Sequence, residues 1–206
     1  MNCNNIKQII YHIGDKIIEN KDYLTQLDQP IGDSDHGINM ARGFSNVKTQ
    51  IESLDIDDIG DLVKKVGMTL VSTVGGASGP LYGSAFLKAG MVLSNKTTIS
   101  LDDFLIALTE AIEAVKSRGK AELNEATMLD AMIPSLDAMK LAQKDGLSAK
   151  DVLAKGVEAS YQGVEHTKTL VATKGRASYL GERGIGHQDP GATSYTYILE
   201  AIMESL

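Results

Sequence analysis

Three aspartates gather in a short stretch near the start of the chain. Asp28, Asp33 and Asp35 fall within eight residues, and Pro30 and Gly32 between them favour a loop over a regular helix. Carboxylates held in one loop repel one another, so a cation should accompany them, and a hard divalent ion is the natural partner. The stretch therefore predicts a Mg2+ site.

A simpler interpretation of part of this stretch stays open. The run Asp33-Ser34-Asp35 alone is typical of a turn followed by a helix N-cap, because aspartate and serine favour both positions and acids suit a helix N-terminus. Asp28 favours the metal, since three converging acids are costly without a cation. A Ca2+-binding EF-hand loop is excluded by its register, because Gly37 and Phe44 stand where that loop requires ligands.

Two glycine-rich loops supply a second kind of chemistry. Residues 74–82 and 174–194 offer backbone N–H groups and basic side chains, which a polyphosphate needs. Neither loop follows a Walker A or a dinucleotide-binding pattern. Close helix packing through small residues is an alternative for the first loop, and a solvated surface loop followed by helix initiation at Asp189 is one for the second. Carboxylates, metal and phosphate together indicate nucleotide chemistry.

Composition narrows the class of protein. With 206 residues and 43% hydrophobic content, the chain can bury a real core, and we expect a single domain over residues 1–206. The net charge of -7 argues against a nucleic-acid partner. Cys3 is the lone cysteine and the N-terminus lacks a secretory signal, so cytoplasmic residence is expected. No apolar run approaches the roughly 18 to 20 residues that span a bilayer, so we expect no membrane insertion.

Apolar residues recur at helical spacing through most of the chain. The stripes run over residues 6–17, 59–70, 104–115, 129–139 and 153–164. Further helices are expected to start near Gly37, Ala77 and Gly191. The total is about eight helices and almost no convincing strand, which predicts an all-α fold.

Local signals mark some of the helix boundaries. Ser100 with Asp103 and Ser148 with Asp151 are typical of helix N-caps with an acid three residues later. By contrast, residues 173–190 form a stretch that is too long and too polar to be a mere connection.

Four segments together resemble one family, the ADP-binding L subunits of phosphotransferase-system-dependent dihydroxyacetone kinases. The segments are residues 28–43, 67–83, 117–120 and 174–194. The resemblance spans essentially the whole chain, and the combination is more specific than any single motif. It implies an all-α, up-down barrel of about eight antiparallel helices, with the nucleotide site in the loops at one end.

The resemblance also implies roles for particular residues. Asp28, Asp33 and Asp35 would coordinate two Mg2+ ions that bridge the nucleotide phosphates. The bound ADP or ATP would lie against a larger set of residues. That set is His36, Gly37, Ile38, Asn39, Ala77, Ser78, Gly119, Met128, Arg176, Asp189, Pro190 and Gly191. Arg176 would in addition assist catalysis electrostatically.

The implied activity is that of a kinase subunit whose nucleotide stays bound. A phosphohistidine on a separate phosphocarrier M subunit would phosphorylate ADP in place. The resulting ATP would transfer its γ-phosphoryl group to dihydroxyacetone on a separate K subunit. Association of the chain into a homodimer is left open.

Two other classes of function agree less well with the sequence. A non-catalytic regulatory partner of a K-like protein or of a transcription factor is disfavoured, because the acids and the basic residues of 174–184 are intact. A helical Mg2+-dependent phosphohydrolase or prenyl-transfer enzyme would also want clustered acids. Prenyl-transfer enzymes usually show two Asp-rich helix motifs, and none is found here.

Overall fold

A computed structural model describes residues 1–206, which fold into helices joined by loops. The elements are α1 (Cys3–Glu19), α2 (Lys21–Asp28), α3 (His36–Glu52), α4 (Ile59–Thr73), α5 (Ser78–Val92), α6 (Leu101–Gly119), α7 (Leu129–Lys144), α8 (Ala149–Thr167), the 3-10 helix η1 (Arg176–Gly184) and α9 (Pro190–Glu204). The one strand-like contact is an isolated bridge between Asn2 and Thr98. The predicted all-α fold is confirmed.

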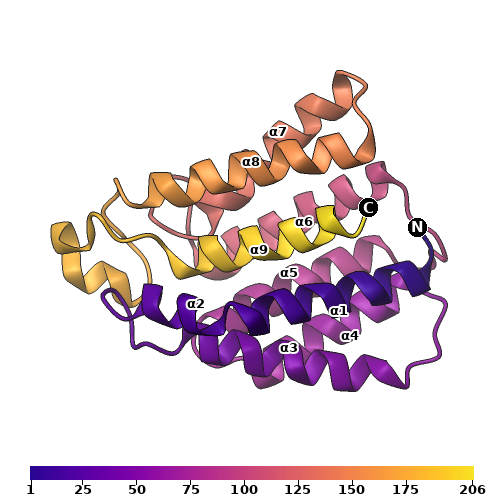
Figure 1. Cartoon of the computed structure of the whole chain (residues 1–206), viewed down its shortest axis with the longest axis horizontal. Coiled ribbons are helices and arrows are strands. Elements are labelled where there is room, and N and C mark those ends of the chain that lie inside the picture. Colours follow the sequence, from indigo (N-terminus) through magenta and orange to yellow (C-terminus); the bar gives the residue numbers. More distant parts are fainter.

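The long helices form a closed ring. In the order α1, α3, α4, α5, α6, α7, α8 and α9, each packs against the next, and α9 returns to α1 (Figure 1). Both termini lie at one end of the ring, while the loop after α2 and the segment around η1 lie at the other. The up-down barrel that the resemblance implied is therefore present.

Two short elements were not expected from the sequence. Helix α2 has eight residues, of which only Leu24 and Asp28 are buried, so it is too short to show a repeating apolar stripe. The 3-10 helix η1 turns every three residues and bends at Gly181, where φ is 56°. A pattern search at the α-helical period cannot detect such an element.

The predicted N-caps are present. The Ser100 side chain accepts a hydrogen bond from the backbone N–H of Asp103 at 3.2 Å, and the Asp103 carboxylate accepts one from the Ser100 N–H at 2.9 Å. Ser148 likewise accepts from the N–H of Asp151 at 3.2 Å. These side chains satisfy N–H groups that have no acceptor inside their own helices.

The interior is aliphatic and incompletely filled. One cluster of 42 buried apolar residues runs through the ring, and its aromatic packing includes Phe44 against Phe86 with ring centroids 6.5 Å apart. A cavity of about 360 Å³ remains within the ring, and 26 of its 27 lining residues are hydrophobic. Its wall is made by residues from most of the ring helices, including α1, α5, α6 and α9.

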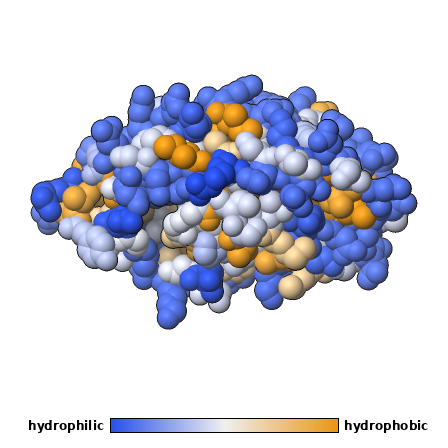
Figure 2. All heavy atoms as spheres, turned by 90° about the horizontal axis from the view of Figure 1, so that it is seen from below, coloured by the Kyte–Doolittle hydropathy of each residue, from blue (hydrophilic) through white to orange (hydrophobic).

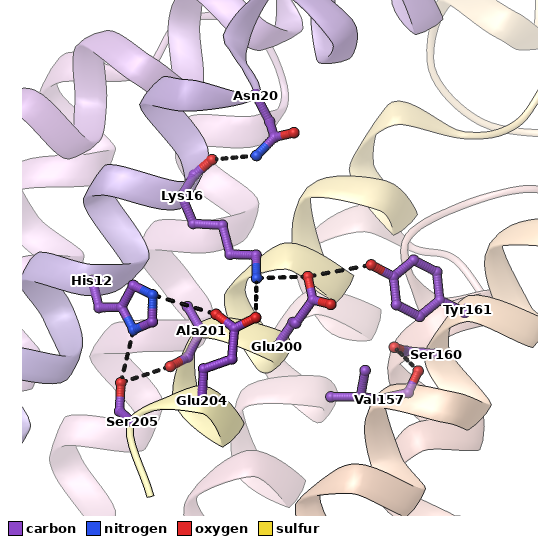
Figure 3. A network of polar contacts seen from close by, with 10 residues as sticks. All are labelled: His12, Lys16, Asn20, Val157, Ser160, Tyr161, Glu200, Ala201, Glu204 and Ser205. Carbon is purple, nitrogen blue, oxygen red and sulfur yellow. Dashed lines mark hydrogen bonds and ion pairs between the residues drawn. The ribbon is translucent and has the colours of Figure 1, made fainter.

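A polar network fixes the contact that closes the ring between the first and last helices. Lys16 on α1 lies between two carboxylates of α9, at 2.8 Å from Glu200 and 2.7 Å from Glu204 (Figure 3). The hydroxyl of Tyr161 on α8 donates to Glu200 at 3.2 Å, and His12 lies 3.3 Å from Glu204. The network therefore joins α1, α8 and α9.

The outer surface is mainly hydrophilic. Large hydrophobic side chains are exposed at separate places, such as Met68, Met91, Leu141 and Tyr179. The face drawn in Figure 2 shows the corresponding pattern, with small apolar patches set among hydrophilic residues. None of the helices combines the length and the apolar character needed to cross a membrane.

Helices α4 and α5 approach each other through two pairs of glycines. A Cβ on Gly60 would lie 2.6 Å from the carbonyl oxygen of Gly90, and one on Gly90 would lie 2.7 Å from that of Gly60. Gly67 and Gly83 are related in the same way, at 2.9 and 3.0 Å. Any side chain at these positions would push the two backbones apart.

We expect Gly67→Ala to lower the free energy of unfolding by about 1–3 kcal/mol, because the added methyl meets the backbone of α5. Gly14→Ala is the matched control inside another helix, since its Cβ would meet the side chain of Lys48, with Cδ at 2.9 Å, and no backbone atom of a neighbouring helix. That control should be neutral or stabilising, because alanine favours helix. Urea denaturation compares the two variants, and equal stability would contradict the close-packing argument.

Candidate functional site

A second cavity, of about 500 Å³, lies at the end of the ring away from the termini. Its wall includes the starts of α3, α5, α7 and α9, because antiparallel neighbours make every second helix begin at the same end. Each helix start presents N–H groups without an intrahelical acceptor and the positive end of the helix dipole. Four such ends around one cavity suit a polyanion.

The three aspartates meet at one edge of this cavity. One oxygen from each of Asp28, Asp33 and Asp35 lies within 4.8 Å of the others. Asp28 is buried at the end of α2, and the other two are in the loop that follows. Three carboxylates at this spacing form the oxygen ligand set that Mg2+ prefers, so these residues fit the predicted metal.

Asp28 also caps helix α3 from outside that helix. Its Oδ2 accepts the backbone N–H of Asp35 at 2.9 Å and that of His36 at 3.2 Å. Asp35 occupies the N-cap position of α3, yet its own side chain makes no capping hydrogen bond. The simple N-cap interpretation therefore does not account for the carboxylates of Asp33 and Asp35.

Glycine is required next to the buried acid. A Cβ at Gly32 would lie 1.9 Å from Oδ1 of Asp28. Ser34, two residues later, has a φ of 62°, a left-handed conformation that few side chains favour. The loop is thus bent tightly around the Asp28 carboxylate.

The 3-10 helix η1 brings Arg176 to the segment of residues 28–35, called the acid loop below. A guanidinium nitrogen of Arg176 lies 2.7 Å from Oδ2 of Asp33, in an ion pair whose side chains are 66% and 39% exposed. An exposed pair of this kind contributes at most about 1 kcal/mol. Nearby, Lys174 lies 3.4 Å from Glu125. The segment before and at the start of η1 is therefore held over the cavity by weak contacts.

His36 lies buried between two hydroxyl groups. Its Nδ1 is 3.1 Å from Oγ of Ser78, and its Nε2 is 2.9 Å from Oγ of Ser194. Tyr82 extends the series, with its hydroxyl 2.7 Å from the same Ser194 oxygen. Burial lowers the pKa of His36 to about 4, more than the nearby Asp28 carboxylate raises it. The imidazole is therefore neutral near pH 7.

Asp189 both caps a helix and lines the cavity. Its carboxylate accepts the N–H of Ala192 at 2.6 Å at the start of α9, where Pro190 occupies the first turn. Desolvation raises the pKa of Asp189 to about 7 against the effect of that hydrogen bond, and the charges of Asp130 and Asp28 act in the same direction as desolvation. The helix-initiation interpretation of Asp189 is correct, and the same carboxyl is available to the cavity.

Most of the predicted site residues line this one cavity. They are Asp28, Asp33, Asp35, His36, Ala77, Ser78, Gly119, Met128, Arg176, Asp189, Pro190 and Gly191. The remaining three do not line it. Gly37 packs against α2, where a Cβ would lie 2.0 Å from the Lys21 carbonyl oxygen, and Asn39 accepts a hydrogen bond from Arg42 at 2.7 Å. The side chain of Ile38 is exposed.

Other contributors were not singled out from the sequence. Arg118 and Lys174 add positive charge to the cavity wall, and Thr127 adds a hydroxyl. Ser194 on α9 contacts His36, and Tyr82 on α5 contacts Ser194, although Ser194 is far from both in sequence. The two basic residues lie in segments that the sequence had marked, whereas the contacts of Ser194 leave no local signal.

Comparison with known proteins gives relatives of matching length. The model of the DAK2 domain family matches residues 30–204. The ADP-binding subunit DhaL of the PTS-dependent dihydroxyacetone kinase of Lactococcus lactis is 48% identical over 190 residues, which cover 92% of this chain and 91% of that protein. The ADP-binding subunit DhaL of the PEP-dependent dihydroxyacetone kinase of Escherichia coli is 41% identical over 189 residues, which cover 92% and 90%.

Solved structures share the fold. The dihydroxyacetone kinase of C. freundii in its native form matches with a TM-score of 0.77 at 25% identity, over 98% of this chain and 34% of that kinase chain. The same kinase in complex with AMP-PNP and Mg2+ matches with a TM-score of 0.73 at 24% identity. The chain thus spans about a third of that kinase but nearly all of the DhaL relatives.

These matches agree with the resemblance carried by the acid loop and the two glycine-rich segments. The chain belongs to the DAK2 domain family and, within it, to the ADP-binding L subunits of phosphotransferase-system-dependent dihydroxyacetone kinases.

Proposed function

We propose that this chain holds ADP and ATP together with two Mg2+ ions, and that it relays a phosphoryl group between two partner subunits. The observation that carries the proposal is the meeting of the three aspartates, four helix N-termini and Arg176 around one cavity. The names of the relatives, which describe ADP-binding kinase subunits, support the same assignment.

Asp28, Asp33 and Asp35 are the proposed metal ligands. Bound Mg2+ supplies positive charge that offsets the phosphates of the nucleotide. Asp28 keeps α3 capped through Oδ2, so its other oxygen remains for the metal. Asp33 presently faces Arg176, which gives the guanidinium a position next to the metal ligands.

The rest of the cavity wall is proposed to hold the nucleotide itself. Ala77 and Ser78 at the start of α5, together with His36, face the phosphates. Gly37 and Ile38 are proposed to contribute through their backbone N–H groups in the first turn of α3, because their side chains do not line the cavity. Asn39 is proposed to contribute through its side chain, since its N–H already donates to the Asp35 carbonyl at 2.8 Å.

The far side of the cavity is assigned to the sugar and base. Gly119, Met128 and the turn of Asp189, Pro190 and Gly191 lie together in its wall. Glycine at 191 keeps that wall open, since a Cβ there would lie 2.9 Å from the Asp189 carboxylate. The Asp189 carboxyl is placed to hydrogen-bond a ribose hydroxyl or a base nitrogen.

Arg176 is the proposed catalytic residue. Phosphoryl transfer depends mainly on positioning and on stabilising charge, and a guanidinium suits the oxygens of a transferred phosphoryl group. The weak exposed contact of Arg176 with Asp33 lets it move to those oxygens without a large energetic cost.

The partners follow from the phosphotransferase-system-dependent form of the enzyme. A phosphohistidine on the M subunit would transfer its phosphoryl group to bound ADP, and its imidazole is the leaving group. The γ-phosphoryl of the resulting ATP would then pass to a hydroxyl oxygen of dihydroxyacetone on the K subunit, which regenerates ADP in place. Both reactions require access to the same open end of the ring.

We expect Asp35→Asn to weaken Mg2+-dependent ADP binding by at least about tenfold while the melting temperature stays unchanged, because the Asp35 side chain caps no helix. Isothermal titration with ADP in Mg2+ measures the loss, and titration in EDTA should show no difference from the wild type. Asp22→Asn, at an exposed acid of α2, is the control. Unchanged affinity of the Asp35 variant in Mg2+ would contradict the metal assignment.

We expect Arg176→Ala to slow phosphoryl transfer far more than it weakens nucleotide binding, by roughly a hundredfold or more against a few-fold. Single-turnover transfer from bound ATP to dihydroxyacetone in the presence of the K subunit measures the rate. Arg183→Ala is the control on the same 3-10 helix, since Arg183 does not line the cavity. Equal losses in rate and binding would show that Arg176 only binds.

A further inference from the structure

A series of polar groups runs from the cavity wall into the protein. Ser78 and His36 line the cavity, whereas Ser194 lies behind the imidazole of His36 and has no exposed surface. Tyr82 is bonded to Ser194 at 2.7 Å, Ser194 to Nε2 of His36 at 2.9 Å, and Nδ1 of His36 to Ser78 at 3.1 Å. The four residues come from α3, α5 and α9, so the series ties three helix starts together.

Two arrangements of the hydrogen atoms satisfy this series. A neutral imidazole carries one N–H, so one ring nitrogen donates and the other accepts. If Nε2 carries the hydrogen, Nδ1 must accept from the Ser78 hydroxyl, and Ser78 then turns lone pairs toward the cavity. If Nδ1 carries it, the ring donates to Ser78, and the Ser78 hydrogen is free to point into the cavity.

A phosphate in the cavity distinguishes the two arrangements. Its oxygens accept hydrogen bonds and repel lone pairs, so only the second arrangement gives a favourable contact with Ser78. The second arrangement also requires that Ser194 donate to Nε2. Tyr82 is placed to support this direction, because its hydroxyl can donate to the Ser194 oxygen and leave the Ser194 hydrogen for the imidazole. The Gly191 carbonyl, 3.1 Å from both hydroxyls, is the competing acceptor.

We propose that Ser194 and Tyr82 are positioning residues that hold His36 in the Nδ1–H form while a nucleotide phosphate is bound, so that Ser78 donates to that phosphate. The proposal rests on the proposed function for the identity of the anion. Ser194 does not line the nucleotide cavity, and Tyr82 is part of its wall but turns its buried hydroxyl to Ser194. Their effect passes through the His36 ring.

Removal of the Ser194 hydroxyl should reverse the direction of the hydrogen bond between His36 and Ser78. The carbonyl of Pro190 also lies near the ring and can accept a hydrogen bond from it. In Ser194→Ala no hydroxyl competes with this carbonyl for the ring and nothing donates to Nε2, so the ring hydrogen should move to Nε2. Nδ1 would then accept a hydrogen bond from the Ser78 hydroxyl, and the phosphate would lose Ser78 as a donor.

The direct test is the ring nitrogen spectrum of the wild-type protein with ADP and Mg2+. A long-range 1H–15N experiment distinguishes the two neutral forms, and the His36 signals are assigned by their absence in His36→Gln. The proposal expects hydrogen on Nδ1 in the complex. Hydrogen on Nε2, or on both nitrogens, would overturn it without need of any further variant.

Variants test the consequence for binding. Ser194→Ala should weaken ADP binding about tenfold, as expected for a lost hydrogen bond to a charged group, and should shift the ring to the Nε2–H form. In a Ser78→Ala background the same change should cost almost nothing more, because no hydroxyl remains to be oriented. Tyr82→Phe should act in the same direction as Ser194→Ala but more weakly.

Tyr195→Phe is the matched control. Tyr195 is buried on α9 beside Ser194, its hydroxyl is bonded to Ser135 at 2.6 Å, and it lines the apolar cavity instead of the nucleotide cavity. Its loss should lower stability yet leave ADP affinity and the His36 spectrum unchanged. An equal loss of affinity in Tyr195→Phe and Ser194→Ala would reduce the effect to general destabilisation and overturn the proposal.

These experiments distinguish a failure of the proposed nucleotide-binding function from a failure of the positioning role alone. If the wild-type protein binds no ADP in Mg2+, both the proposed function and the positioning role fall. If it binds ADP tightly while His36 carries hydrogen on Nε2, or while Ser194→Ala binds as well as the wild type, only the positioning role falls.

Discussion

Antiparallel packing in a closed ring is the constraint on which the rest of the structure depends. It makes α3, α5, α7 and α9 begin at the same end, and it therefore collects the positive dipole ends of these helices, with N–H groups that have no intrahelical acceptor, around one cavity. The opposite end carries the termini. The ring closes because α9 packs against α1, where Lys16 lies between Glu200 and Glu204. An anion-binding end is thus a property of the topology before any particular side chain is considered.

Side chains convert this anion-binding end into a site that also demands a cation. Asp28 places a buried carboxylate at the start of α3, and its hydrogen bonds to the backbone of Asp35 and His36 hold the acid loop against the helix. The same carboxylate thereby serves folding and, in the proposed function, metal binding. Asp33 and Asp35 cap no helix, and in the proposed function a bound cation offsets the mutual repulsion of the three carboxylates and links them to the phosphates.

The sequence predicted those features that repeat or stand close together in the chain. Apolar stripes gave the long helices, and Ser100 and Ser148 marked two of their starts. The acid loop was visible because its aspartates are near neighbours. Helix α2 and η1 were not predicted, because α2 is short and η1 repeats every three residues instead of at the α-helical period. The contact between Ser194 and His36 could not be predicted from sequence, because 158 residues separate them and only the closure of the helical ring brings them together.

The unfilled space inside the ring has a mechanical consequence. A cavity of about 360 Å³, in which 26 of the 27 lining residues are hydrophobic, offers few partners to hold water, so it adds to the volume of the folded state. Unfolding eliminates that volume. High hydrostatic pressure should therefore destabilise this protein more than a helical protein of equal size with a filled core. The space that would collapse lies between α1, α5, α6 and α9, and Tyr82 is part of the wall of both this cavity and the nucleotide cavity.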